Sequence, residues 1–515
     1  MKHVARRGPE PAQGRPAALG KGSEMIRRMS PAHRLSLMTV VLAVFAAGCG
    51  GNSFPTGSSP ASGEPTAVAS GPAASGPAAS EPAVPESPPP GSQATMTPDV
   101  TCGPGEAWVG SFGSGAACID EEGWKVFDET NTPLTNGQLA DIAVCADGIT
   151  WLADSSGLVS TDGQTWVNHS TLTENKGFEA VACDPKKGVW LAGYQGVYYF
   201  DGESMTTHPA SEFGTGKYVD QVKDVAVAAD GRVWAVTANS VALWDGTAWR
   251  FWEKGKGFKK EYFFEQVAVD LKDRAWVTTG GNELLLYDGK KWSILSKEFL
   301  SQSKAVAVDP KNRVWVGTYS EGVSSFDGKK WTTYNRGNSD LPSDHVRAIA
   351  ADAKGRIWLG TEWGLAVLEG KKWTLYHMSD SEIRDNEVYS IGVAARGPTL
   401  PELVEKDPGT LSGRVVESGD PKAGLKVEAC VEFVGMMFSG DTPCADQAFH
   451  KLTTTSDDGV FAFTKLPVGR YAITVRGADG KWLRLTDQFR IGDKEVLVQP
   501  GETTDLGDLD IATVE

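Results

Sequence analysis

Few side chains in this sequence have the type and spacing that acid–base, nucleophilic or metal chemistry requires. The chain contains no HExxH, no GxSxG, no phosphate-binding glycine loop and no CxxC pair spaced for zinc. Five histidines lie in the part that we expect to fold, namely His169, His208, His345, His377 and His450. His345, beside Asp344, could serve as a base near neutral pH, but we expect a solvated side chain at the edge of a loop. The sequence therefore predicts no catalytic residue, no metal site and no cofactor.

The charge of the chain argues against one class of partner. There are 50 basic and 66 acidic side chains, which give a net charge of -16. A chain of this sign repels nucleic-acid phosphates, so we expect no nucleic-acid partner. The high content of Trp and Gly is typical of a turn-rich all-β protein, and 515 residues are enough for several domains.

Residues 1–49 have the features of an export signal. A basic stretch precedes an apolar run at residues 35–48, which is too short to span a bilayer as a mature helix. The small residues before Cys49 resemble the bacterial lipoprotein box, although Ala46 stands where Leu is commonest in that family. The resemblance implies acyl chains such as palmitate on Cys49, and a membrane anchor at the bacterial cell envelope.

Two alternatives stay open for this leader. An ordinary secretory signal cleaved near Ala47 would leave Cys49 as a spare thiol, and Met25 is a second candidate for the translation start. Residues 50–98 consist almost entirely of Pro, Ala, Ser, Gly and Thr. Such a composition buries too little apolar surface to fold, so we expect a disordered tether.

Tryptophans repeat through the middle of the chain with a period of about 42 residues. The first marker of each unit is a Trp, at positions 108, 151, 190, 234, 276, 315 and 358. A second marker follows 15 or 16 residues later, at positions 124, 166, 205, 249, 292, 331 and 373, and it is Trp in every unit except the third, where Met205 stands. The last full unit has four short apolar runs bounded by Gly, Asp and Lys. Four strands per unit and seven units predict a seven-bladed β-propeller at residues 99–396.

The first unit begins at its Trp strand and lacks an inner strand, whereas an extra inner-type strand, Val388 to Ala394, follows the seventh unit. We expect this late strand to complete the first blade. The repeats, with RVWVGTYSEGVSSFDGKKWTTY and LPSDHVRAIAADAKGRIWLGTEWGLAVLEGKKWTLY as the clearest copies, resemble the two-component regulator propeller repeat of bacterial sensors. The resemblance implies the fold more than the function. Streptogramin lyases are the most similar enzyme family, but their His and Glu constellation matches no residues here.

A second folded part follows a Pro-containing link at residues 397–410. Residues 411–515 resemble the carboxypeptidase regulatory-like, transthyretin-like β-sandwich of bacterial surface proteins, on the runs LSGRVVESGDPKAGLKVEACVEF and TTTSDDGVFAFTKLPVGRYAITVRG. Alternation from Val460 to Phe463 and from Tyr471 to Val475 predicts half-buried strands.

Apart from Cys49, six cysteines remain in a chain that we expect to be exported, where disulfides form. Cys102 and Cys118 both lie in the first unit, and Cys430 and Cys444 are the only two in the sandwich. Cys145 and Cys183 sit on neighbouring inner strands. These three pairs are our prediction, and small buried thiols are the alternative.

Strand direction predicts where a propeller would bind a partner. The loops between blades and the loops between second and third strands should share one face, which we call the top face. We expect a ligand-binding site there, formed by Glu179, Tyr194, Glu265, Lys304, Tyr319, His345, Arg347, Trp363 and Tyr389. Exposed aromatic residues beside mixed charges suit a sugar or a protein, whereas the plainer account is charges that pair with one another.

These observations favour a non-enzymatic, lipid-anchored envelope protein whose propeller binds a protein or glycan. The first alternative is a lyase- or hydrolase-type enzyme that uses the top of the propeller. The second alternative is a purely structural component of the envelope.

Overall fold

The computed structural model describes residues 94–513, apart from 104, 112–113, 135–138, 172, 174–175, 215–219, 298–299, 301, 431–443, 445–448, 478–479 and 485–495. All of them belong to one compact unit, Pro85–Glu515. Within the described part the fold is all-β, with two short 3-10 helices, η1 (Ala210–Glu212) and η3 (Ile511–Thr513). The expected signal and Cys49 lie outside the described residues, as does the expected tether up to residue 93.

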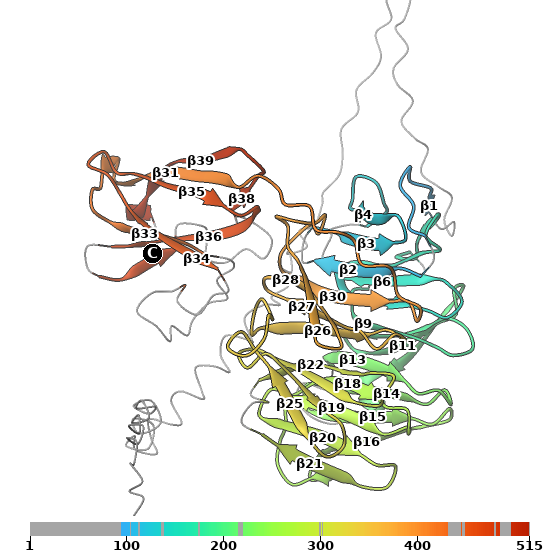
Figure 1. Cartoon of the computed structure of the whole chain (residues 1–515). Coiled ribbons are helices and arrows are strands. Elements are labelled where there is room, and N and C mark those ends of the chain that lie inside the picture. Colours follow the sequence, from blue (N-terminus) through green and yellow to red (C-terminus); the bar gives the residue numbers. More distant parts are fainter. Residues whose placement is uncertain are drawn as a thin grey trace, which may run out of the picture. The chain divides into compact units, whose positions relative to one another are not determined.

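The propeller consists of seven sheets, each containing four antiparallel strands in meander order (Figure 1). Blade 1 contains β30 (Val388–Val393), β2 (Ala107–Ser111), β3 (Ala116–Asp120) and β4 (Gly123–Phe127); blade 2 contains β5 (Leu139–Val144), β6 (Thr150–Asp154), β7 (Gly157–Thr161) and β8 (Trp166–Asn168); blade 3 contains β9 (Phe178–Cys183), β10 (Val189–Gly193), β11 (Gly196–Phe200) and β12 (Met205–Pro209).

The other four blades repeat this order from the inner strand outward. Blade 4 contains β13 (Val222–Val227), β14 (Val233–Thr237), β15 (Ser240–Trp244) and β16 (Trp249–Lys254); blade 5 contains β18 (Phe264–Val269), β19 (Ala275–Thr279), β20 (Glu283–Tyr287) and β21 (Trp292–Ser296); blade 6 contains β22 (Ser303–Val308), β23 (Val314–Thr318), β24 (Val323–Phe326) and β25 (Trp331–Tyr334); blade 7 contains β26 (Val346–Ala351), β27 (Ile357–Thr361), β28 (Gly364–Glu369) and β29 (Lys372–Tyr376).

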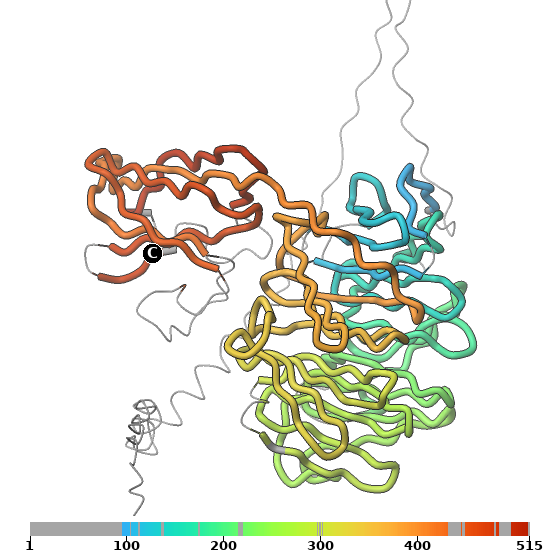
Figure 2. The backbone as a smooth tube through the Cα atoms, in the orientation of Figure 1, coloured from blue at the N-terminus to red at the C-terminus, as the bar shows by residue number. Residues whose placement is uncertain are grey.

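The late strand closes the ring as predicted. β30 pairs with β2, so that Trp108 lies opposite Gly392 and Val109 opposite Ile391. The tube in Figure 2 shows this orange segment beside the blue strands of blade 1. Because a strand from the far end of the propeller completes the first blade, the inner edge of β2 is paired rather than open.

The repeating Trp residues form the cores between blades. The first marker of every unit lies on the second strand of its blade and is at most 6% exposed. In four blades an Asp six residues earlier accepts a hydrogen bond from the indole Nε1, as Asp270 does from Trp276 at 2.9 Å and Asp309 does from Trp315 at 3.1 Å. We call this contact the Asp–Trp clasp. It satisfies a polar group that would otherwise be buried without a partner.

The folded part begins earlier than predicted. β1 (Ala94–Met96), inside the segment that we expected to be a disordered tether, pairs antiparallel with β8 and becomes a fifth strand of blade 2. The backbone continues beside the same blade, because Cys102 donates to the Gly163 carbonyl at 2.8 Å. Blade 4 also has a fifth strand, β17 (Gly257–Phe258), parallel to β16.

The C-terminal part is a sandwich of two sheets. One contains β31 (Gly409–Glu417), β32 (Asp420–Pro421), β35 (Val460–Leu466) and β39 (Thr503–Asp510), and the other contains β33 (Lys426–Cys430), β34 (His450–Thr454), β36 (Gly469–Arg476), β37 (Trp482–Arg484) and β38 (Val496–Val498). The first strand begins at Gly409, inside the expected linker. β35 alternates as predicted, with Phe461 and Phe463 buried.

The prediction of alternating burial for β36 was wrong. Tyr471 to Val475 are all buried, because β36 pairs with β33 and also with β37 and β38, and both of its faces are covered. A central strand of this kind has a continuous apolar run instead of an alternating one.

All three predicted disulfides are present. Cys102 is bonded to Cys118 within the first blade region, and Cys430 is bonded to Cys444 in the sandwich. The disulfide between Cys145 and Cys183 joins the inner strands of blades 2 and 3, and the two Cα atoms are 5.5 Å apart. Covalent links therefore occur at the N-terminal blades and in the sandwich.

Candidate functional site

Every inner strand of the propeller has a register shift at the same place. In each one the residue after the first is left out of the pairing with the second strand, and in β18 the next residue is left out too. A bulge of this kind redirects the side chain of the extra residue. We call the redirected residues the bulge ring: Ala140, Glu179, Lys223, Glu265, Lys304, Arg347 and Tyr389. The sequence analysis named five of them and missed Ala140 and Lys223.

Three members of the bulge ring form an ion-pair chain across blades 4, 5 and 6. The Nζ atom of Lys223 lies 3.1 Å from one oxygen of Glu265, and the Nζ atom of Lys304 lies 3.7 Å from the other. The Glu265 side chain is 19% exposed, and those of Lys223 and Lys304 are 32% and 39% exposed. The contacts join neighbouring blades, so the bulged side chains lie side by side at one end of the inner strands.

Blade 7 and the closing strand continue the ring. Arg347 forms an ion pair with Glu387, and its guanidinium lies 4.5 Å from the centre of the Tyr389 ring. Both Arg347 and Glu387 have side chains less than 20% exposed. The pairing of charges with one another, which the sequence left as the plainer account, therefore holds for most of the ring.

Glu179 differs from the other charged members of the ring. It is exposed, and no hydrogen-bond or ion-pair partner for it exists among the residues that the structure describes. Its neighbour on one side is the ring position of Ala140, which carries no charge. On its other side the ring position is Lys223, which pairs with Glu265. The ring therefore presents one exposed carboxylate between an uncharged position and the chain of ion pairs.

His345 is buried, which corrects the expectation of a solvated side chain. It is 4% exposed, and its Nδ1 lies 3.2 Å from one oxygen of Glu362. The other oxygen of Glu362 accepts a hydrogen bond from the Ser343 hydroxyl at 2.9 Å. The ring of Tyr319 packs against the imidazole with centroids 4.2 Å apart. Because one carboxylate orients both Ser343 and His345, this cluster fixes the loop that precedes β26.

Two further aromatic residues of the predicted site lie outside the bulge ring, as Tyr319 does. Trp363, expected as an exposed anchor, is half-buried, tilted against the His377 ring, and stacked on Phe449 with ring centroids 5.5 Å apart. The sequence could not show this contact, because Phe449 lies far along the chain. Tyr194 is 61% exposed, and its carbonyl accepts a hydrogen bond from the Tyr198 hydroxyl.

Two carboxylates that were not expected from the sequence lie one residue beyond the bulge: Asp224, which is buried, and Asp141, which is half-buried. Asp141 accepts a hydrogen bond from the Val181 amide of the next inner strand at 2.9 Å, and Asp224 accepts one from Val267 at 2.7 Å. Burial raises the pKa of Asp141 to about 6 and raises the pKa of Asp224 well above its ordinary value. These side chains tie neighbouring blades together through the backbone.

Three other histidines are poor candidates for proton transfer. Burial lowers the pKa of His169 to about 4, and it also lowers the pKa of His208 and of His377. His169 contacts the Ser160 hydroxyl at 2.8 Å, but both side chains are at most 6% exposed. A neutral imidazole that is buried in this way contributes to the packing of the core.

The loop between blades 4 and 5 is basic at its surface and aromatic beneath. We call residues 254–263 the basic loop. Lys254, Lys256, Lys259 and Lys260 are exposed, whereas Phe258 and Tyr262 are each 6% exposed. Phe263 is 46% exposed, and a Cβ on Gly280 would lie 3.8 Å from its Cβ and 3.4 Å from a carboxylate oxygen of Glu265. The loop therefore reaches the bulge ring at blade 5.

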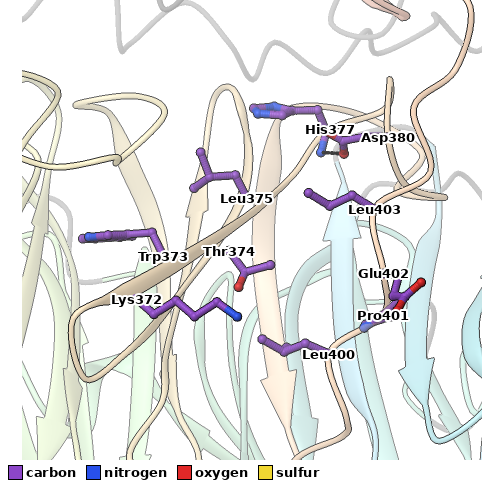
Figure 3. A pocket seen from close by; sticks show the side chains of 10 residues that line it. All are labelled: Lys372, Trp373, Thr374, Leu375, His377, Asp380, Leu400, Pro401, Glu402 and Leu403. Carbon is purple, nitrogen blue, oxygen red and sulfur yellow. Dashed lines mark hydrogen bonds between the residues drawn. The ribbon is translucent and has the colours of Figure 1, made fainter.

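A groove of about 650 Å³ lies elsewhere, beside the outer strand of blade 7. Figure 3 shows side chains from β29 on one side and from the segment after the propeller on the other. The groove is lined by Lys372, Trp373, Thr374, Leu375, His377, Asp380, Leu400, Pro401, Glu402 and Leu403. It contains no member of the bulge ring and none of the residues predicted for the site. The hydrogen bond from the Tyr376 hydroxyl to the Pro401 carbonyl holds that segment in place.

No group of three or more His, Cys, Asp or Glu side chains in the described part is arranged to hold a metal ion. The described residues also include no helix of the length and apolar character needed to cross a membrane.

The family model of the two-component regulator propeller matches residues 340–363. This segment runs from the end of blade 6 through the first two strands of blade 7. It includes five residues of the candidate site and its surroundings: Ser343, His345, Arg347, Glu362 and Trp363. No curated protein matches the chain in sequence.

Several solved structures have a similar arrangement. A streptogramin B lyase is 12% identical, with a TM-score of 0.41, covering 49% of this chain and 86% of that one. PorZ, a surface component of the type-IX secretion system of Porphyromonas gingivalis, is 14% identical, with a TM-score of 0.43, covering 72% of this chain and 62% of that one.

The extracellular domain assigned to a hybrid two-component system of B. thetaiotaomicron is 14% identical, with a TM-score of 0.35, covering 58% of this chain and 49% of that one. This chain thus spans only part of the last two structures. Its own seven sheets and the match at residues 340–363 show a β-propeller with a repeat similar to that of two-component regulators.

Proposed function

We propose that this chain is a non-enzymatic envelope protein, anchored through a lipid on Cys49, whose propeller binds a ligand at the bulge ring. The observation that carries the proposal is the bulge that recurs at one position in all seven inner strands. Seven redirected side chains at one end of the axis create a surface that can vary without disturbing the blades. The side chains of the bulge ring differ in type from one blade to the next.

The distribution of charge supports recognition by two members of the ring, one in blade 3 and one in blade 6. Arg347 is held by Glu387 and Tyr389, and Lys223 is held by Glu265, so these side chains are committed to the fold. Glu179 is exposed without a partner, and Lys304 is 39% exposed and held only by a contact of 3.7 Å. These two residues have the greatest freedom to contact a ligand, which would be a polar protein surface or a glycan.

The test is a binding screen with variants of these two residues. Fractionated envelope glycans and envelope proteins would be titrated against the chain from residue 94 onward, with affinity measured by calorimetry. Glu179→Gln and Lys304→Ala should each weaken binding by about fivefold or more, since truncating a true contact typically costs over 1 kcal/mol.

Lys329→Glu serves as the matched control, because Lys329 is exposed at the turn between β24 and β25. This change should leave binding unaltered. Loss of binding in the control with no effect of the two ring variants would move the site to another face.

An acid–base enzyme is the second candidate, favoured by the buried Glu362–His345 pair. The Ser343 hydroxyl donates a hydrogen bond to Glu362, and this contact favours a structural role for the Glu362–His345 pair. If a bound ligand were cleaved, and His345→Ala abolished cleavage while leaving affinity unchanged, the enzyme would replace the binding protein.

A further inference from the structure

The basic loop reverses the charge of the protein locally. The whole chain has a net charge of -16, yet residues 250–261, which include most of the basic loop and the four residues before it, contain more cations than anions. The basic side chains are Arg250, Lys254, Lys256, Lys259 and Lys260, and the acidic ones are Glu253 and Glu261. An anionic partner would be repelled by most of the molecule and attracted here.

The backbone of the loop is held in one conformation. Glu253 and Lys256 exchange two backbone hydrogen bonds, both 2.9 Å long, and Gly255 donates to Phe258 at 2.8 Å. Beneath them, the Phe258 ring packs on Tyr262 and on Trp292 with centroids 5.4 and 5.3 Å apart. Little backbone entropy remains to be lost when the loop meets a surface.

Two lysines of the loop are not neutralised by the protein. Lys254 lies 3.6 Å from Glu261, and Lys260 forms an ion pair with Glu283. Lys256 instead sits over the Phe251 ring, 3.1 Å from its centre. Lys259 is exposed and has no carboxylate partner within the described part of the chain. Lys256 and Lys259 thus provide the unbalanced positive charge.

We propose that the basic loop docks the propeller on a membrane surface rich in anionic phospholipid. Exposed lysines and an exposed aromatic side chain in one loop suit the boundary between headgroups and acyl chains, where Phe263, 46% exposed, would enter. The loop lies at the outer strands β16 and β17, so a flat surface can approach it. The docking is a second contact beside the ligand of the bulge ring, because Phe263 lies close to Glu265 of that ring.

The length of chain before the propeller allows this contact. Residues 50–93 separate Cys49 from β1, and a segment of that size spans at most roughly 150 Å when fully extended. Two unpaired lysines give weak attraction alone, about fivefold for each. A tether that keeps the propeller near the membrane supplies an effective concentration on the order of millimolar, which makes weak docking significant.

Vesicle co-sedimentation tests the proposal, using the exported chain with Cys49→Ala so that no acyl chain contributes. Vesicles of phosphatidylcholine alone are compared with vesicles in which about a third of the lipid is phosphatidylglycerol. We expect binding only to the anionic vesicles, with a loss at high salt because the Debye length shortens. Lys256→Glu with Lys259→Glu should weaken binding at least about 25-fold.

The matched control is Lys329→Glu with Lys330→Glu, which changes the net charge equally at another turn. It should retain most of the binding. Equal loss in both double variants, or equal binding to neutral and anionic vesicles, would overturn the proposal. Binding to a soluble polyuronate with none to the vesicles would also overturn it, in favour of a polysaccharide partner.

Discussion

At the scale of single residues, the Asp–Trp clasp explains why most blades share an Asp six residues before the core Trp. In the clasps of blades 5, 6 and 7 an Arg completes the contact, as Arg313 does by donating to Asp309 at 2.6 Å. Blade 4 has the Arg and the Trp, but Ala228 stands in place of the Asp. The indole Nε1 of Trp234 is consequently buried without a hydrogen-bond partner in the described part.

Ala228→Asp should stabilise the propeller. The backbone at Ala228 already resembles that of the clasps, because its amide donates to the Arg232 carbonyl at 2.8 Å, as that of Asp309 does to Arg313 at 3.0 Å. The new carboxylate would accept from Trp234 and Arg232, which should contribute about 1 kcal/mol and raise the Tm by about 2–4 °C. Differential scanning calorimetry measures the change.

The control for this prediction removes the donor. In a Trp234→Phe background the indole N–H is absent, so adding the Asp should bring a smaller gain. A lower Tm for Ala228→Asp in the wild-type background would show that the site cannot accommodate a carboxylate.

The pKa of Asp141 predicts a pH dependence with a defined sign. Its folded-state pKa, about 6, lies above the ordinary value of 3.8 for an aspartate, so the folded protein binds this proton more tightly than the unfolded chain does. The stability that this group contributes is therefore present at low pH and lost as the pH rises from about 4 through about 6. The full effect of this shift is about 3 kcal/mol, of which about 1 kcal/mol falls between pH 7 and pH 5.

Asp141→Asn isolates this contribution. Urea unfolding between pH 7 and pH 5 should show the wild type gaining stability relative to the variant as the pH falls. Parallel pH profiles for the two proteins would mean that Asp141 keeps its ordinary pKa.

Residue types alone revealed only part of the site. Five members of the bulge ring could be named because they occupy one position of a repeat. The ion pairs between them could not be predicted, because they depend on a β-bulge that no residue pattern in the sequence indicates. His345 and Trp363 were misplaced for a related reason, because Glu362 and Phe449 bury them from elsewhere in the chain.

At the scale of elements, closure by β30 relies on close contact with the next inner strand, β5. A Cβ added at Gly392 would lie 2.7 Å from Cγ2 of Ile142 and 2.9 Å from its carbonyl oxygen. Gly392→Ala should therefore destabilise the propeller by about 2 kcal/mol through overpacking at the seam. Chemical denaturation would measure the loss.

Gly280→Ala is the matched control for the seam. A Cβ at Gly280 has its nearest neighbour at 3.4 Å, in ordinary contact, and the substitution should change stability little. If both glycine variants unfold at the wild-type midpoint, β30 and β5 are less tightly packed than the closure requires.

Strand order could be predicted from the sequence because the Trp spacing counts blades and the surplus strand after the seventh unit has only one partner. β1 could not, since its residues, Ala94 to Met96, follow a Pro- and Ser-rich stretch and have no apolar alternation. Its pairing with β8 depends on a free outer edge that is visible only in the assembled blade.

At the scale of the whole molecule, the lipid proposed for Cys49 would determine where the protein resides. Mass spectrometry of the mature N-terminus should detect acyl chains on Cys49, and Cys49→Ala should release the protein from membranes. An unmodified N-terminus a few residues away would indicate an ordinary secretory signal instead.

The N-terminal attachment also determines how the protein would respond to tension. A pull on the chain before Ala94 first meets three residue pairs between β1 and β8, which can peel apart in sequence. Peeling then reaches Cys102, whose bond to Cys118 passes the force into β3 of blade 1. The first blade is closed by β30, so the force is spread over the ring rather than unravelling it strand by strand. A reducing environment would remove this mechanical stop without changing any surface that binds.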